Sequence, residues 1–456
     1  MKASSAQGVL RQTMFFKAVL ISIFADACKI QSLIPMLSAI MFQKIMIAIP
    51  FIGLFTSPQL GKNIIKSFNT ARGKVLIFLV AWMVFSVPFS IYPGEGFRFL
   101  TEHLWKMLIT LCLILAYGNT KESLDKMLWA FILAVGIFGV IAFISNATGR
   151  FSVVAEYDPN ENALLFVLAV PFVLWKMMAS QGFKKVLMAG LLCLIVVGIV
   201  ETQSRGGFLG LLAVAFVSLY QYRRVAKIRF VGVKIVAIIV LIAGVLYFAG
   251  GEQYSNRIST IFNTSSEYNY TSLSGRLTIW RQGFALMLDH PFLGVGVDSF
   301  ETALGRTFRL DEGAWQTAHN SFLQVGAELG FPGLIAYCFI ILSTLLYLKK
   351  AAAAQAVPKT AAGEGSKKKL NFGTITANSL IGSWTGFIVS GSLLSVAYGN
   401  LVFFLIGTSW AFINIASSPQ ERKEPVLQEK ASTHEAPALR LAGMTRSSLR
   451  RYGRYR

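Results

Sequence analysis

Long apolar runs, separated by short segments rich in Lys and Arg, repeat along most of the chain. An α-helix needs ~20 mostly apolar residues to cross ~30 Å of hydrocarbon, and inside a bilayer every backbone polar group must be hydrogen-bonded within the protein. Many of the runs approach this length, and they lack the polar-apolar alternation of a membrane barrel. The sequence therefore predicts an all-α integral membrane protein, a bundle of about twelve transmembrane helices.

The charge of the chain agrees with a membrane protein. Hydrophobic residues make up 54% of the 456 residues and charged residues only 14%, whereas a soluble domain has about 25% charged residues. The net charge of +21 would suggest a nucleic-acid partner in a soluble chain. Here the Lys and Arg residues gather in the connections between apolar runs and in the tail, which is the positive-inside pattern. We therefore expect membrane lipids, and no nucleic acid, as partners of the basic segments.

The apolar runs divide the chain into four parts. Residues 1–250 are predicted to form an N-terminal transmembrane bundle of about nine spans. Residues 251–318 are predicted to form one long periplasmic loop with amphipathic helices. Residues 319–416 hold the C-terminal transmembrane helices, with a flexible cytoplasmic linker at 349–370. Residues 417–456 form a basic cytoplasmic tail that is predicted to be disordered.

The basic connections all fall on one side of this predicted bundle, and both termini lie there. The predicted spans are residues 14–30, 33–55, 75–91, 99–117, 128–145, 163–179, 186–200, 208–220, 231–250, 321–348, 379–397 and 401–416. Residues 56–74 are predicted to be a cytoplasmic loop, 92–98 an external turn and 398–400 a tight turn. The second span contains Lys44, which is costly at mid-bilayer. We assign no role to Lys44 or to Asp26.

The chain shows no metal or disulfide pattern. Its four cysteines lie within or near the ends of apolar runs and have no ligand spacing. Asp158 and Glu161 in EYDPNENA are suited to holding a hard cation, but we favour a turn and helix cap before Ala163. We expect neither a metal nor a cofactor.

Arg205 is the first candidate for chemistry. It stands in ETQSRGG at the predicted outer end of a span, where a helix starts or breaks. Exposed backbone N–H groups beside a guanidinium form a good anion site, and phosphate is the obvious anion. The alternative interpretation is an interfacial arginine that reaches the lipid headgroups.

Arg276 and Arg281 lie in GRLTIWRQGFALML, which has the pattern of an amphipathic helix. Arg276 and Trp280 are four residues apart, and Leu277, Trp280, Phe284 and Leu288 follow helical spacing. Such a helix would lie near the membrane interface and hold its arginines at headgroup depth. The alternative is a plain interfacial anchor.

His319 precedes Asn320 where the chain is predicted to re-enter the membrane. A neutral imidazole with an ordinary pKa of about 6.5 is the side chain most often used to take a proton from a hydroxyl. A histidine at the end of a span also serves as a structural hydrogen-bonding group. We assign no chemical role to the histidines at 103, 290 and 434 or to the glycines in GVGVD.

Four segments, SRGG, GRLTIW, DHPFLGVG and AHNSFLQVGAELGFPGL, occur in this order on the same predicted side. Together they resemble the O-antigen ligase and O-antigen polymerase superfamily of bacterial envelope glycosyltransferases. The resemblance covers roughly residues 158–346. It implies a helical, GT-C-like enzyme of the inner membrane with a periplasmic active face, which needs no metal ion.

The resemblance also implies the substrates and the site residues. The donor would be a glycan on undecaprenyl diphosphate, and the acceptor would be lipid A-core in a ligase or a growing polysaccharide in a polymerase. The family's arginines fall on Arg205 and Arg276, and its histidine falls on His319; Arg281 is a less secure addition. The arginines would hold the diphosphate, and His319 would accept the proton of the acceptor hydroxyl in a single, inverting displacement.

Three alternatives stay open at this stage. A third branch of the superfamily glycosylates protein hydroxyls, and we lean to the other two because the chain lacks an added domain for a protein acceptor. A transporter or flippase would use the same arginines only to bind diphosphate, but such proteins tend to show internal repeats, and we find none that is clear. A non-catalytic scaffold would use the basic tail for docking.

Overall fold

The computed structural model describes residues 2–144, 151–152, 158–226, 275–310, 315–354 and 370–418. Every regular element in these residues is a helix, which confirms the all-α class. Six described helices are long and apolar enough to cross a membrane, or up to seven if one bent pair is counted as a span. The chain is therefore a multi-pass membrane protein, while the number twelve stays a prediction. The predicted span 231–250 lies outside the described residues, as do 355–369 and 419–456.

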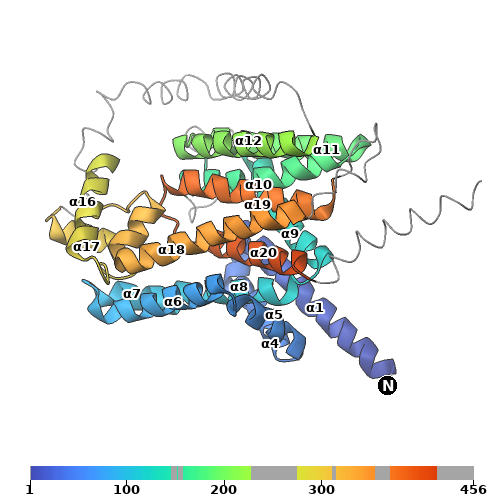
Figure 1. The fold of residues 1–456 in the computed structure, drawn as a ribbon, viewed down its shortest axis with the longest axis horizontal. Coiled ribbons are helices and arrows are strands. Elements are labelled where there is room, and N and C mark those ends of the chain that lie inside the picture. Colours follow the sequence, from blue (N-terminus) through green and yellow to red (C-terminus); the bar gives the residue numbers. More distant parts are fainter. Residues whose placement is uncertain are drawn as a thin grey trace, which may run out of the picture.

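The helices of the bundle run side by side along its long axis (Figure 1). The long helices are α1 (Lys2–Ala27), α6 (Ala71–Ser86), α8 (Trp105–Tyr117), α9 (Lys121–Ile144), α10 (Pro159–Ala179), α11 (Gly182–Glu201), α12 (Arg205–Ala226), α18 (Ser321–Ala354), α19 (Phe372–Gly391) and α20 (Asn400–Ala416). Two shorter helices, α16 (Arg276–Asp289) and α17 (Phe300–Thr307), lie together at one end of the bundle (Figure 1).

Helix α10 is the centre of the bundle, because most of its residues are buried and it packs against α9, α11, α12 and α19. Small residues on α19 allow this close approach. Ser379 and Ser383 donate hydrogen bonds to the carbonyls of Pro171 and Leu168, at 3.2 and 2.7 Å. Such small residues and hydroxyls are typical of helix contacts inside membranes.

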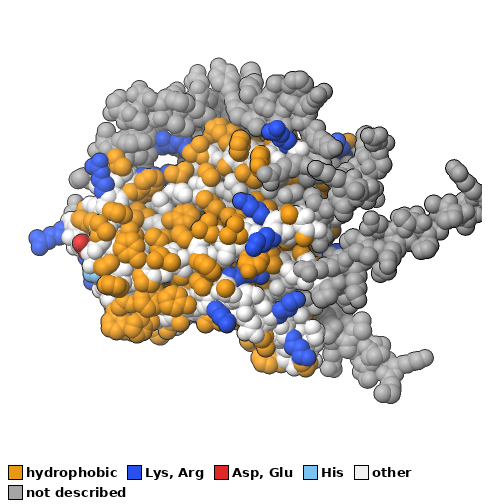
Figure 2. Space-filling model, viewed as in Figure 1, with side chains coloured by type: hydrophobic (Ala, Val, Ile, Leu, Met, Phe, Trp, Pro, Cys, Tyr) orange, Lys and Arg blue, Asp and Glu red, His pale blue; other side chains and the backbone are white. Residues whose placement is uncertain are grey.

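The outer surface carries the apolar band that a membrane protein needs. Figure 2 shows hydrophobic side chains spread over the middle of the bundle, with most of the visible Lys and Arg side chains toward its right-hand part. Large exposed apolar side chains occur on several of the long helices, among them Phe143, Ile335 and Leu342. A continuous apolar surface of this kind is rare on soluble monomers.

The second predicted span is wrong as a single helix. Residues 33–55 are divided among α2 (Ile30–Leu33), α3 (Pro35–Ala39) and α4 (Phe42–Leu54), because Ile34 is extended and Met41 has a left-handed φ of 52°. The chain then bends by 98° into α5 (Pro58–Phe68), which occupies much of the predicted cytoplasmic loop 56–74. Proline favours the first turn of a helix and stops the one before it.

Two predicted turns are also helical or displaced. Residues 93–98 of the predicted external turn belong to α7 (Pro93–Phe99), which continues through a π-helical turn (Leu100–Leu104) into α8. The last connection is longer than predicted, because α19 ends at Gly391 and the non-helical segment 392–399 precedes α20. Hydropathy wrongly predicts helix in this segment because its residues are mostly apolar. Its backbone groups instead bond to other parts of the chain.

Asp26 receives a structural role that the sequence did not indicate. Its carboxylate accepts hydrogen bonds from Gln43 and Asn400, both at 2.7 Å, and forms an ion pair with Lys29 at 3.3 Å. The side chain is partly buried, so these partners compensate for its lost hydration. Asp26 therefore ties the end of α1 to the starts of α4 and α20.

Candidate active site at one end of the bundle

The starts of α10 and α12 are joined by side-chain hydrogen bonds. Asp158 caps α10 in a capping box with Glu161, which confirms the interpretation of this acidic segment as a helix cap. Ser204 donates to Asn160 Oδ1 at 2.8 Å and accepts the N–H of Gly207 at 3.1 Å. These bonds fix the first turn of α12, where the half-buried Arg205 is the first residue.

The segment 392–399 connects this helix start to His319. Ser390, near the end of α19, donates to the carbonyl of Gly206 at 3.1 Å. A few residues later, the hydroxyl of Ser395 accepts the backbone N–H of His319 at 2.7 Å. Ser321 also donates to the carbonyl of Leu394 at 2.7 Å. The start of α12 is thus held to the last turn of α19, and the start of α18 is held to the segment that follows it.

Helix α16 is held to the residue that precedes His319. The indole Nε1 of Trp280 donates to the carbonyl of Ala318 at 3.0 Å. Arg276 lies one turn earlier on the same helix, since residues four apart share a helix face. The described structure thus brings Arg276 toward His319.

The backbone of His319 has an unusual conformation that hydrogen bonds around it hold in place. Its φ is 46°, in the left-handed region that few non-glycine residues adopt. Its backbone N–H is bonded to Ser395, and the next residue, Asn320, accepts the N–H groups of Phe322 and Leu323 at 2.9 and 3.1 Å. An outlier that its surroundings hold in place is common at functional sites.

The electrostatic environment keeps the His319 imidazole neutral. Burial lowers its pKa below the ordinary 6.5, the positive charge of Arg276 lowers it further, and the carboxylate of Asp158 opposes both. Asp158 and Arg276 are therefore both close enough to act on His319. A neutral imidazole near pH 7 is able to accept a proton.

Arg281 does not join this group. It is exposed and stands five residues after Arg276, which places it about 140° around the helix. The apolar stripe predicted for α16 is also turned outward, since Phe284 and Leu288 are 52% and 53% exposed. The face that packs on the protein contains Ile279, Leu286 and Met287 instead. An outward apolar stripe suits a helix at the lipid interface.

The glycine-rich motifs without a predicted role form a clasp, which we define as residues 290–299 together with the break in α18. At Gly330 the backbone of α18 leaves the helix, with φ 66° and ψ −172°. Val295 and Gly296 donate their N–H groups to the carbonyls of Ala327 and Glu328, at 2.8 and 3.0 Å. The clasp therefore bonds carbonyls that the broken helix leaves free.

Glu328 completes the clasp from inside the protein. It is 1% exposed, and its carboxylate accepts the N–H groups of Asp298 and Phe300 at 3.1 and 3.3 Å. Those N–H groups belong to the start of α17. Sequence reasoning missed this contact, although an acidic residue inside an apolar run is a signal for a buried partner.

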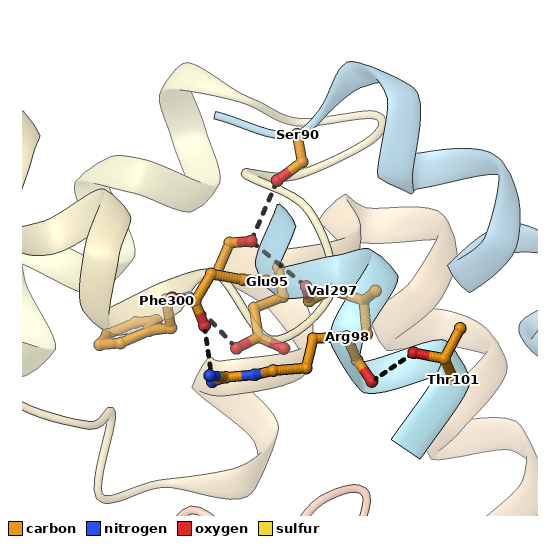
Figure 3. Close-up of polar contacts among 8 residues, drawn as sticks. Ser90, Glu95, Arg98, Thr101, Val297 and Phe300 are labelled. Carbon is orange, nitrogen blue, oxygen red and sulfur yellow. Dashed lines mark hydrogen bonds and ion pairs between the residues drawn. The ribbon is translucent and has the colours of Figure 1, made fainter. Parts of the chain in front are cut away.

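Figure 3 shows how the connection between α6 and α7 supports the clasp. Ser90 donates to the carbonyl of Val295 at 3.0 Å and lies 3.0 Å from the hydroxyl of Ser299. Arg98 and Glu95 form an ion pair at 3.3 Å on α7 beside it. Burial and the charge of Glu95 raise the pKa of Asp298 to about 6. Residues 290–299 of the clasp thus contact both α18 and the connection between α6 and α7.

Residues 189–338 match the family model described as O-antigen ligase. The match begins in α11 and ends in α18, so it contains all four predicted site residues and the whole clasp. It places this segment in the O-antigen ligase and polymerase superfamily, as the four motifs predicted. No curated protein matches the chain.

Proposed function

We propose, on the premise of this O-antigen ligase segment in an all-helical membrane protein, that the chain is a membrane glycosyltransferase. It transfers a glycan from undecaprenyl diphosphate to an acceptor hydroxyl at the periplasmic face of the inner membrane. The observation that carries the proposal is a chain of hydrogen bonds: the end of α19 bonds the α12 start, the segment after α19 bonds His319, and α16 bonds the residue before His319. The family supports a lipid-linked polysaccharide substrate.

The arginines act on the leaving diphosphate. Negative charge grows on this group as the glycosyl–phosphate bond breaks, and guanidinium groups held in place stabilise it. Arg205 begins α12, so the positive end of the helix dipole adds to its charge. Arg276 approaches from α16. Together they fill the role that a metal ion has in other glycosyltransferases, and the exposed Arg281 has at most an outer contact with the diphosphate.

His319 acts as the base. Its neutral imidazole accepts the proton of the acceptor hydroxyl as the hydroxyl oxygen attacks the anomeric carbon. Attack from the face opposite the diphosphate inverts the configuration at that carbon in one step. Arg276 lowers the pKa of His319 and so keeps it ready to accept a proton.

Transfer by the purified protein in detergent with EDTA tests the proposal. We expect a product from undecaprenyl-diphosphate glycan with either lipid A-core or a second lipid-linked repeat unit, and the extended acceptor separates ligase from polymerase. Arg205→Ala should lower the rate ~10²–10³-fold, and His319→Ala ~10²–10⁴-fold. The exposed Arg306→Ala is the matched control. Full activity of the His319→Ala protein would overturn the assignment of the base.

One observation favours a second function, a transporter for the same lipid-linked glycans. Broken helices near the membrane centre are typical of transporters, and α18 is broken at Gly330. In this chain, however, the clasp bonds the carbonyls at the break. Movement of labelled donor across liposomes without glycan transfer would favour the transporter, whereas transfer to a protein hydroxyl would favour the third branch.

A further inference from the structure

A cavity of about 630 Å³ opens at the end of the bundle opposite His319. Helix α20 starts beside segment 392–399 and runs 17 residues, about 25 Å, to the cavity. The cavity is lined by Gln59, Asn63, Lys66, Leu115, Gly118, Asn119, Thr120, Lys121, Glu122, Ala411, Asn414, Ile415 and Ser418. These residues come from α5, the connection between α8 and α9, and the end of α20 (Figure 1).

The lining is cationic and rich in hydrogen-bonding groups. The charged side chains of the lining are Lys66, Lys121 and one acidic residue, Glu122, and the remaining polar groups are amides and hydroxyls. The first turn of α9, a helix of 24 residues, also contributes to the wall. Lysines and a helix start together favour an anion.

The walls are held in place before any ligand binds. Asn63 donates to the carbonyl of Ala116 at 3.0 Å, which ties α5 to the end of α8. Asn414 donates to Ser67 at 2.7 Å, which ties the end of α20 to α5. A preformed site loses less conformational freedom when it binds.

Helix α5, which lines this cavity, has the features of a helix at the depth of lipid headgroups. It follows α4 after a bend of 98°, so it runs across the direction of that helix. Leu60 and Ser67 are buried, whereas Lys62, Lys66 and Ile65 are exposed. A short helix that buries one face and exposes lysines beside an apolar side chain is typical of the membrane interface.

We propose that this cavity binds the headgroup of an anionic phospholipid from the leaflet at the end of the bundle opposite His319. Lys66 and Lys121 pair with the phosphate, the amides bond to headgroup hydroxyls, and Leu115, Ala411 and Ile415 meet the start of the acyl chains. A nucleotide fits less well, because none of the described residues that line the cavity is aromatic and able to stack on a base. This inference does not depend on the proposed reaction.

Native mass spectrometry of the full-length protein in detergent tests the proposal with phosphatidylglycerol and phosphatidylcholine as probes. We expect wild type to bind phosphatidylglycerol more tightly, and Lys66→Gln with Lys121→Gln to weaken that binding at least ~10-fold. The control, Lys184→Gln with Lys185→Gln, removes two exposed lysines from the start of α11 and should change binding less than ~2-fold. Equal losses in both double variants, or equal binding of both lipids, would overturn the proposal.

Lysine labelling of the wild-type protein in nanodiscs gives a second measurement that needs no variant. Phosphatidylglycerol should slow the acetylation of Lys66 and Lys121 and leave Lys184 and Lys185 unchanged, relative to phosphatidylcholine nanodiscs. Millimolar sn-glycerol 1-phosphate distinguishes a soluble ligand from a lipid. Protection of the two cavity lysines by this compound, without protection by phosphatidylglycerol, would overturn the lipid assignment.

Discussion

Helices α10 and α18 both contain a proline, yet only α18 breaks. Around Pro171 the helix α10 stays continuous and buried. In α18 the break lies at Gly330, two residues before Pro332. A proline cannot donate to the carbonyl four residues earlier, so both helices lose one internal hydrogen bond.

The difference lies in what surrounds each proline. In α18 the carbonyl left without its partner is that of Glu328, and Gly296 of the clasp donates to it at 3.0 Å. In α10 the carbonyl left without its partner is that of Val167, which lies beside the small residue Gly386 of α19. Ser379 of the same helix donates to the carbonyl of Pro171, which does not replace the lost bond. A proline is therefore compatible with a continuous helix in α10, whereas the break in α18 combines a glycine conformation with a second segment that supplies N–H groups.

The largest effect is expected at Gly330. Its φ and ψ are restricted almost entirely to glycine, and a Cβ there would collide with the carbonyl of Phe292. Gly330→Val should lower the free energy of unfolding by at least about 3 kcal/mol. Thermal unfolding in detergent measures this change. Gly190→Ala is the control, because a Cβ at this helical position in α11 meets nothing within 4 Å. Equal stability of both variants would mean that the break does not depend on Gly330.

Glu328 should show the next largest effect. Glu328→Ala leaves the N–H groups of Asp298 and Phe300 buried without their acceptor, which costs about 1–3 kcal/mol for each group. Glu328→Gln keeps one acceptor oxygen and should cost clearly less. The two variants are compared by thermal unfolding of the purified proteins. An equal loss in both would indicate that the negative charge matters more than the acceptor.

The pH dependence of transfer should sharpen the comparison, because residues 290–299 of the clasp follow α16 in the chain and bond to α18, the helix that begins just after His319. Burial and Arg276 lower the pKa of His319, so the wild-type rate should fall on acidification only below about pH 6.5. Removing the positive charge in Arg276→Gln raises that pKa and moves the acidic limb to higher pH. The measurement is the transfer rate at saturating donor between pH 5 and 8. An acidic limb that stays in place would show that Arg276 does not act on His319.

The smallest effects are expected at the prolines themselves. In Pro332→Ala the break persists, because Gly330 keeps its conformation and the N–H of Phe331 still donates to Pro291 at 2.8 Å. In Pro171→Ala the helix is already continuous. Both variants should change the free energy of unfolding by less than about 1.5 kcal/mol. A large loss in Pro332→Ala alone would make proline, and not glycine, the cause of the break.

Hydropathy and local patterns predicted the parts of the fold that depend on neighbours in the sequence. The membrane class, most of the described long helices and the Asp158 cap follow from composition and from spacings of a few residues. The resemblance also pointed to His319 and Arg276, which the structure brings toward each other. Their chemical roles remain proposals.

The missed features depend on contacts between distant residues. The bond from His319 to Ser395 joins positions 76 residues apart, and the bond from Trp82 to the carbonyl of Leu329 joins positions 247 apart. The break in α18 lies inside a run that is mostly apolar despite Glu328, so hydropathy predicts one span. The bend between α4 and α5 depends on backbone dihedral angles, and a hydropathy profile contains no information about these angles.

The three partners of Asp26 also constrain how the protein is made. The ribosome delivers Asp26 and Lys29 to the membrane first, Gln43 soon after, and Asn400 only 374 residues after Asp26. Until then this carboxylate lacks one of its hydrogen bonds, while the other helices are already being inserted. The set of bonds at Asp26 is therefore completed only when α20, the last helix in the described residues, returns to α1.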